Sequence, residues 1–208
     1  MAGSLASARP DSDDWRAWRK AERERLIAAR QNWPDAPRKA ATAAITDLLT
    51  ARFPPSSFAS LGVYWPFRRE FDPLPFARAV IAAGGWVALP VVVQPRSPLD
   101  FRSWTPQSKM EAGVWNIPHP AEGPAVTPSA FLVPLVGFDG EGYRLGYGAG
   151  YYDRTLAARP DRPLAIGVGF ELNRIATLGA RPHDIPMDYI VTEAGLFPTL
   201  AGAHRRAS

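Results

Sequence analysis

Three alternating glycines separate an apolar run from a helix-forming segment in the second half of the chain. The apolar run covers residues 131–136 and has the composition of a buried strand. Gly146, Gly148 and Gly150 follow it, and residues 151–158 then favour a helix. Glycine has no Cβ, so the backbone can turn tightly and direct several N–H groups at one point. The segment from Gly146 to Gly150, here named the glycine elbow, therefore predicts an α/β unit with an anion-binding turn.

Charged side chains flank the glycine elbow. Arg144 and Arg154 carry full positive charge, and Asp153 offers a hard oxygen ligand of the kind that Mg²⁺ prefers. A helix N-terminus adds partial positive charge at the same place. These are the parts of a nucleotide-phosphate site. The spacing matches neither G-x-x-x-x-G-K-[ST] nor G-x-G-x-x-G, so a plain tight turn between strand and helix explains the pattern alone equally well.

Segments of strand length and helix length alternate along the chain. Expected helices cover residues 11–31, 35–52, 72–83 and 150–159, and expected strands cover residues 58–64, 86–93, 99–104, 131–136, 164–170 and 189–192. This order predicts an α/β fold with a mostly parallel central sheet flanked by helices, after an N-terminal helical pair. Ligands in such sheets lie beyond the carboxyl ends of the strands, which is where we expect the glycine elbow. Residues 105–128 are rich in proline and glycine and predict a long functional loop.

The composition is that of an ordered protein. Apolar residues make up 46% of the 208 residues and charged residues 21%, which suits one large core. We expect a disordered tail over residues 1–10, a single domain over residues 11–200 and a second tail over residues 201–208. The chain has no cysteine, which excludes disulfides, zinc–thiolate sites and a cysteine nucleophile and fits a cytoplasmic location. No apolar run approaches the length of a membrane span, and we expect no signal peptide.

A small anionic ligand explains the net charge of +4 at least as well as a nucleic acid does. The positive residues of the first expected helix alternate with acidic ones such as Glu22 and Glu24, a pattern typical of a solvated helix face. We therefore expect neither nucleic acid nor membrane as a partner. The patterns G-x-S-x-G and H-E-x-x-H do not occur, which excludes a serine hydrolase and a zinc protease. His119 and His183 stand in proline-flanked turns and are interpreted as structural.

Five segments together carry a resemblance to a known family. They are residues 64–72, residues 99–104, residues 115–120, residues 133–139 with 144–153, and residues 182–188 with 191–193. In this order they resemble the 5-formyltetrahydrofolate cyclo-ligase family, also called methenyltetrahydrofolate synthetase. The glycine segment is the most diagnostic of the five, and the resemblance covers nearly the whole chain.

The resemblance implies a fold and a reaction. The fold is the α/β kind shared with sugar-phosphate isomerases and CoA transferases. The reaction is the ATP-dependent conversion of 5-formyltetrahydrofolate to 5,10-methenyltetrahydrofolate. ATP would phosphorylate the formyl oxygen, the nitrogen at position 10 would attack the formyl carbon, and phosphate would leave. The protein would align the two substrates and stabilise charge on the transferring group. We expect a monomer that binds ATP and the reduced folate, with Mg²⁺ as cofactor.

The resemblance also implies roles on the ATP side. The ATP phosphates would be held by Arg19, Arg144, Gly146, Tyr147, Gly148, Ala149, Gly150, Tyr151 and Tyr152. Catalysis would depend on Arg144, Tyr151 and Asp153, and Asp153 would ligate Mg²⁺. The plainer interpretation of Asp153 is a helix cap. Ala149 replaces the middle glycine of the family's turn, which is tolerable where φ is negative.

On the folate side the resemblance implies four contacts. Glu70 would accept hydrogen bonds from pterin N–H groups, and Trp115 would stack on the folate. Tyr64 and Trp104 would be additional walls. The plainer interpretations are an exposed loop carboxylate for Glu70 and a core anchor of the long loop for Trp115.

The first helix departs from the family's pattern. Members usually present Lys-x-x-x-Arg to the phosphates, but with the arginine at Arg19 the lysine position falls on Trp15. Two cations on one helix face are available only as Arg19 with Arg23, or as Arg16 with Lys20. Either a different cation holds ATP, or the chain is a non-catalytic or altered folate- or nucleotide-binding relative. A sugar-phosphate isomerase is a third interpretation, with support from the glycine elbow alone.

Overall fold

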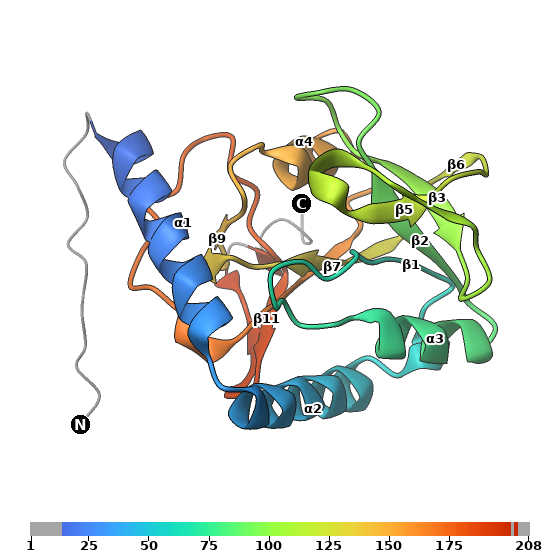
Figure 1. Cartoon of the computed structure of the whole chain (residues 1–208), viewed down its shortest axis with the longest axis horizontal. Coiled ribbons are helices and arrows are strands. Elements are labelled where there is room, and N and C mark those ends of the chain that lie inside the picture. Colours follow the sequence, from blue (N-terminus) through green and yellow to red (C-terminus); the bar gives the residue numbers. More distant parts are fainter. Residues whose placement is uncertain (1–13, 201, 204–208) are drawn as a thin grey trace.

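Eight strands form one central sheet in the computed structural model, which describes residues 14–200, 202 and 203 (Figure 1). In order across the sheet the strands are β12 (Gly195–Pro198), β11 (Tyr189–Thr192), β10 (Leu164–Val168), β7 (Ala130–Pro134), β1 (Ser60–Gly62), β2 (Trp86–Val91), β3 (Asp100–Trp104) and β6 (Ala125–Val126). The strands from β11 to β2 run parallel, and β12, β3 and β6 add antiparallel edges. The predicted α/β fold with a mostly parallel sheet is confirmed.

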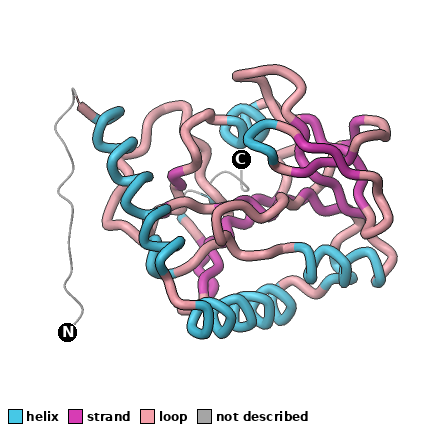
Figure 2. The backbone as a smooth tube through the Cα atoms, in the orientation of Figure 1, coloured by secondary structure: helices cyan, strands magenta, loops and turns pink. Residues whose placement is uncertain are grey.

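Helices cover both faces of this sheet. The helix α2 (Asp35–Arg52) and the helix α3 (Leu74–Ala82) lie on one face, and the short helix α4 (Tyr151–Ala157) lies on the other (Figures 1 and 2). The long helix α1 (Trp15–Asn32) stands beyond the carboxyl end of β7, where Leu26 packs in a small apolar cluster with Val136 and Leu145. The predicted N-terminal helical pair is present, and α2 has the predicted bounds.

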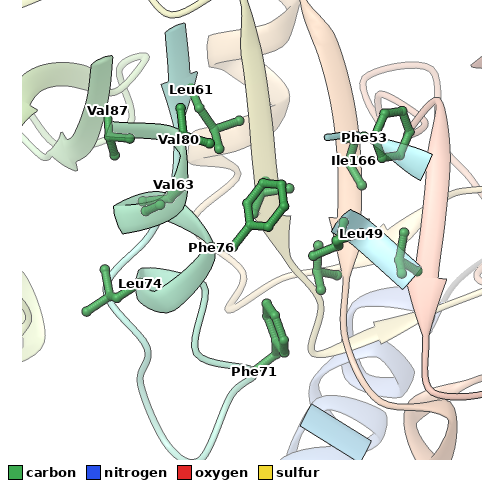
Figure 3. Close-up of a cluster of buried hydrophobic side chains, with 14 of the residues drawn as sticks. Leu49, Phe53, Leu61, Val63, Phe71, Leu74, Phe76, Val80, Val87 and Ile166 are labelled. Carbon is green, nitrogen blue, oxygen red and sulfur yellow. The ribbon is translucent and has the colours of Figure 1, made fainter. Parts of the chain in front are cut away.

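The core lies on both sides of the sheet because successive side chains of a strand point to opposite faces. Leu132 and Ile166 point toward α2 and α3, in the larger cluster that Figure 3 shows. Phe131 and Val133 point the other way and pack in a second cluster with Leu156 of α4. Strands buried on both faces explain the continuous apolar runs in the sequence.

The segment 105–128 is more ordered than the predicted loop. It contains the hairpin of β4 (Met110–Ala112) and β5 (Pro118–Pro120), with a short 3₁₀ turn, η2 (Val114–Asn116), at its tip. It also contains β6, which pairs with β3 at the edge of the sheet. The strands are only two or three residues long, and β5 is Pro-His-Pro, so no periodic pattern marks them in the sequence.

A second hairpin stands between β7 and the glycine elbow, so the elbow does not follow that strand directly. It consists of β8 (Gly137–Phe138) and β9 (Arg144–Leu145). The Asp139 carboxylate closes its turn by accepting hydrogen bonds from the N–H groups of Glu141 and Tyr143, both at 3.1 Å. The hairpin extends beyond the carboxyl end of β7, and the elbow continues from it toward α4 at the predicted edge of the sheet.

Some predictions fall on residues that the structure does not describe. These are the tail over residues 1–10, the helix start at residue 11, and residues 201 and 204–208 of the second tail. The division into one domain and two tails stays a prediction. Within residues 14–200 and 202–203, no helix combines the length and apolar character needed to cross a membrane.

Candidate functional site

A cavity of about 380 Å³ lies between the glycine elbow and α1. Arg16, Arg19 and Arg23 of α1 line one wall, and residues 146–150 of the elbow line the other. The remaining lining residues are Trp15, Trp115, Pro134, Arg144, Leu145, Tyr151, Tyr152, Asp153, His183 and Asp184. His183, interpreted as structural from the sequence, therefore stands at this cavity too.

The glycine elbow has the geometry of an anion-binding turn. Gly148 and Gly150 have φ values of +97° and +64°, a region that side chains with a Cβ rarely adopt. Ala149 is not among the positive-φ residues, so alanine is tolerated there. Among the described residues, none accepts a hydrogen bond from the backbone N–H groups of residues 147–150. These N–H groups are therefore available to an anion.

Arg23 ties α1 to the elbow. Its Nε donates to the carbonyl oxygen of Gly146 at 2.7 Å, and its guanidinium lies against Gly148, where a Cβ would stand 3.3 Å from Cζ. Burial lowers the pKa of Arg23, and the neighbouring charge of Arg19 lowers it further. The sequence indicates Arg23 only as a possible partner of Arg19 on one face of the helix. In the structure it lines the cavity and binds the elbow.

Arg19 is held in place by an acid. Its guanidinium binds both oxygens of Asp184 at 2.6 and 3.2 Å, and the two side chains are only 11% and 9% exposed. Burial raises the pKa of Asp184, but the hydrogen bonds from Arg19 and from the backbone N–H of Arg181 outweigh it and leave the pKa below its ordinary value. Arg19 thus lines the cavity with its charge already partly balanced.

Trp15 stands where the family pattern has lysine and gathers cations around its ring. The guanidinium carbons of Arg16, Arg19 and Arg181 lie 4.7, 5.3 and 5.0 Å from the ring centroid. Cations over a tryptophan face are attracted by its quadrupole. The Trp15 ring therefore holds arginines beside the cavity.

Asp153 faces the same cavity from the first turn of α4. Its Oδ1 lies 3.1 Å from the Arg144 guanidinium and accepts a hydrogen bond from the N–H of Ile185 at 3.0 Å. The Asp153 side chain is 22% exposed, whereas Arg144 is nearly buried. The structure therefore brings together Arg144, Asp153 and the elbow, as the sequence predicted.

The two tyrosines after the elbow both line the cavity. Tyr152 is the deeper one, and burial raises the pKa of its hydroxyl. Among the described residues this hydroxyl has no hydrogen-bond partner. A buried hydroxyl without a partner is costly, so a ligand that reaches this depth would gain a hydrogen bond there.

A second cavity of about 260 Å³ adjoins the first. Arg23, Trp115 and Tyr147 line both cavities and form their shared wall. The other residues of the second cavity are Lys20, Glu24, Ile27, Phe67 and Arg68. It combines aromatic rings with positive charge, which suits a flat ligand that carries carboxylates.

Trp115 reaches the shared wall from the tip of the β4–β5 hairpin. It is 50% exposed, and its ring centroid lies 5.8 Å from that of Tyr147. Trp115 and Asn116 have φ values of +56° and +63°. Trp115 is therefore a cavity wall and not a core anchor of the loop.

Similarity to known proteins identifies the family of this chain. The family model described as the 5-formyltetrahydrofolate cyclo-ligase family matches residues 15–193. The chain belongs to this family. It is 32% identical to the 5-formyltetrahydrofolate cyclo-ligase of Escherichia coli (strain K12) over 158 residues, which cover 72% of this chain and 85% of that relative.

Two further members of the cyclo-ligase family support the assignment. The chain is 41% identical to the Mycoplasma pneumoniae 5-formyltetrahydrofolate cyclo-ligase over 63 residues, which cover 30% of this chain and 38% of that relative. The solved structure of Aquifex aeolicus 5,10-methenyltetrahydrofolate synthetase superposes with a TM-score of 0.75 at 28% identity, covering 88% of this chain and 93% of that one. Sequence and fold therefore agree on the family.

Against the roles implied by the cyclo-ligase resemblance, Glu70 lies deeper than expected. It is 5% exposed and lines neither cavity. Its carboxylate accepts hydrogen bonds from the Tyr147 hydroxyl at 3.0 Å and from the Phe67 N–H at 2.9 Å, and Arg30 lies 3.7 Å away. Burial raises the pKa of Glu70, and these neighbours partly offset the rise. Glu70 is thus not an exposed loop carboxylate but a buried group behind Tyr147.

Tyr64 and Trp104 are core residues and not cavity walls. They are 4% and 3% exposed, and neither lines a cavity. The Tyr64 hydroxyl donates to the carbonyl oxygen of Phe71 at 2.9 Å, so its polar end is already satisfied. Trp104 packs in the cluster under α2 and α3. The aromatic rings that line the second cavity are instead those of Phe67, Trp115 and Tyr147.

Proposed function

We propose that this chain catalyses the ATP-dependent conversion of 5-formyltetrahydrofolate to 5,10-methenyltetrahydrofolate. The observation that carries the proposal is the glycine elbow, whose N–H groups have no partner among the described residues and which lines one cavity together with the α1 arginines, while its Tyr147 lines the second cavity too. Two adjoining cavities, one along the glycine elbow and one beside Phe67 and Arg68, suit two substrates that must meet at a shared wall.

The triphosphate of ATP lies along the glycine elbow in the larger cavity. The N–H groups of residues 147–150 and the N-terminus of α4 bind phosphate oxygens, and Arg144 with Arg23 balances their charge. The reduced folate lies in the second cavity against Trp115 and Tyr147. In this arrangement the γ-phosphate and the formyl oxygen meet at the shared wall.

The reaction needs alignment more than a protein nucleophile. The formyl oxygen takes the γ-phosphoryl group and ADP leaves. The nitrogen at position 10 then attacks the formyl carbon, and the carbon–oxygen bond breaks to release phosphate while the nitrogen loses its proton. Guanidinium groups and backbone N–H groups stabilise the negative charge on the transferring group. The cavity offers these donors and no activated nucleophile is required.

Asp153 fits as the protein ligand of a Mg²⁺ that arrives with ATP. Among the described residues, no group of three or more His, Cys, Asp or Glu side chains is arranged to hold a metal. Mg²⁺ in nucleotide sites commonly takes only one or two carboxylates, with phosphates and water as the other ligands. The partly exposed Asp153 at the cavity meets that need. The ion would neutralise part of the phosphate charge when bound.

The wider proposal is a monomeric, cytoplasmic enzyme that works on ATP and free reduced folate without nucleic acid or membrane. Both cavities are built from residues of one chain. Sedimentation at micromolar concentration tests the monomer, and a dimeric mass would overturn that part.

The non-catalytic alternative has weaker support. It was motivated by the missing lysine of the first helix, but three arginines line the cavity from α1 and Trp15 holds two of them. Cationic charge at the phosphate site is therefore retained.

A single-turnover assay tests the proposal. Enzyme in excess is mixed with 5-formyltetrahydrofolate, ATP and Mg²⁺, and the methenyl absorbance is followed. We expect product that depends on ATP. No product at high enzyme, while both ligands still bind, would favour the non-catalytic relative.

A further inference from the structure

Arg30 is a fully buried cation near the end of α1 that joins three separate segments. It is 1% exposed. Its Nε donates to the carbonyl oxygen of Arg68 at 3.1 Å, its Nη1 to the carbonyl oxygen of Leu135 at 3.1 Å, and its Nη2 to the Tyr147 hydroxyl at 2.8 Å. These acceptors belong to the turn before α3, to the end of β7 and to the glycine elbow. One guanidinium thus fixes the relative positions of three pieces of the site.

The Tyr147 hydroxyl is held from both sides. It accepts from Arg30 and donates to Oε1 of Glu70 at 3.0 Å. Burial raises the pKa of Tyr147, so the hydroxyl keeps its proton and its donating direction. The carboxylate of Glu70 is itself fixed by the Phe67 N–H at 2.9 Å. Arg30, Tyr147 and Glu70 form one connected buried network, here named the Arg30 clamp.

The clamp also holds an unfavourable backbone turn. Arg68 and Arg69 have φ values of +48° and +60°, which cost free energy for residues with a Cβ. Such a conformation persists where surrounding contacts hold it, and Arg30 binds the carbonyl oxygen of Arg68. Phe67 and Arg68 of this turn line the second cavity. The clamp therefore shapes that cavity on two sides.

The ring of Tyr147 is the part of the network that a substrate would touch. It lines both cavities, and the ring centroids of Phe67 and Trp115 each lie 5.8 Å from its own. Arg30 and Glu70 line neither cavity. Of the three segments that Arg30 binds, only the elbow, through Tyr147, and the turn at residues 67–70 line the second cavity, so Arg30 acts on that cavity through these two.

We propose that Arg30 is a positioning residue for the folate: through the Tyr147 hydroxyl it fixes the wall shared by the two cavities. This inference rests on the proposed function, because it assigns the folate to the second cavity. It differs from a purely structural role, in which Arg30 would stabilise the fold without setting substrate affinity. The difference can be measured.

A double-mutant cycle on folate affinity tests the proposal. Tyr147→Phe removes only the hydroxyl, and Arg30→Gln removes the cation. We expect each to raise the KM for 5-formyltetrahydrofolate about tenfold while the KM for ATP changes less than about twofold. In the Tyr147→Phe background, Arg30→Gln should have clearly less effect, because its partner is already gone. Arg30→Lys, which keeps the charge, should recover part of the affinity.

Two controls match these variants. Arg25 lies on α1 with a side chain that is 53% exposed, and it lines neither cavity, so Arg25→Gln should leave both KM values unchanged. Tyr143→Phe removes a tyrosine hydroxyl from the neighbouring β8–β9 turn and should do the same. Additive effects of Arg30→Gln and Tyr147→Phe, or a fall in melting temperature without a change in folate KM, would overturn the proposal.

The test remains decisive if Arg30→Gln fails to fold. The cycle is then made with Tyr147→Phe and Glu70→Gln, which share one hydrogen bond. Coupling between them in folate affinity supports the clamp, and additivity rejects it. Equilibrium binding of 5-formyltetrahydrofolate, followed by tryptophan fluorescence, gives the same readout without turnover. A wild-type protein that binds folate but forms no methenyl product would refute the proposed reaction and leave the clamp to be judged on binding.

Discussion

The two ends of the candidate site are built differently. At the elbow end, the proposed phosphate site, the glycine elbow presents N–H groups without partners among the described residues and lines a cavity together with arginines of α1. At the Glu70 end the polar groups already bind one another, and Tyr64 and Trp104 are buried in the core. A motif therefore indicates which segments of the chain form a site. It does not indicate which of them face the ligand and which support those that do.

The largest effect is expected for Asp153→Asn, which tests the role of Asp153 beside the glycine elbow. We expect turnover to fall by about 100-fold or more, because the carboxylate that suits Mg²⁺ is lost while an oxygen remains for the Ile185 N–H. The melting temperature should change little. Steady-state kinetics and thermal unfolding measure the two quantities.

Asp161→Asn is the matched control, since Asp161 pairs with Arg159 at the surface. Normal turnover of Asp153→Asn at ordinary Mg²⁺ would remove Asp153 from the mechanism.

The elbow geometry is tested by Gly148→Ala. Alanine at φ +97° is strained, and its Cβ would press on the Arg23 guanidinium at 3.3 Å. We expect the KM for ATP to rise about tenfold and the free energy of unfolding to fall by about 1 kcal/mol. Gly140→Ala, at a position with open space around the new Cβ, should change neither quantity. An unchanged KM for ATP despite lower stability would mean that the elbow does not hold the phosphates.

Trp115→Ala tests which of the two substrates binds in the second cavity. Removing a half-exposed indole from the shared wall should raise the KM for the folate several-fold, about 1 kcal/mol of lost stacking, and the KM for ATP less. Val114→Ala is the control, since Val114 is exposed beside it. If ATP affinity falls more than folate affinity, the ligands are assigned to the wrong cavities.

The smallest kinetic effect is expected at the Glu70 end, for Tyr64→Phe. The hydroxyl donates to the Phe71 carbonyl oxygen inside the core, so its loss should lower the free energy of unfolding by about 1 kcal/mol. Both KM values should stay within about twofold of the wild type. A raised folate KM at unchanged stability would restore Tyr64 as a folate contact.

Much of the fold could be predicted because its signals are local. Composition predicts β2, β7 and β10, which are continuous apolar runs. Prolines before and after α2 predict its bounds. The β8–β9 hairpin could not be predicted, because each strand has two residues and the turn depends on one carboxylate, that of Asp139. Such a short strand pair depends on tertiary contacts, which the local sequence does not show.

The candidate site divides in the same way. Arg144, Asp153 and the elbow stand close together in the sequence, so their meeting could be predicted. The Arg30 clamp could not, because Arg30 and Tyr147 are 117 residues apart and nothing local marks Arg30. The burial of Trp104 could not be predicted either, because its position in the motif does not indicate whether its side chain is exposed.

The most direct test of the account is a backbone NMR titration of the protein with a non-hydrolysable ATP analogue and Mg²⁺. The account predicts that the largest shifts fall on the N–H signals of residues 147–150, with smaller shifts at the side chains of Arg23 and Arg144. Large shifts elsewhere, with the glycine elbow unchanged at saturation, would contradict it.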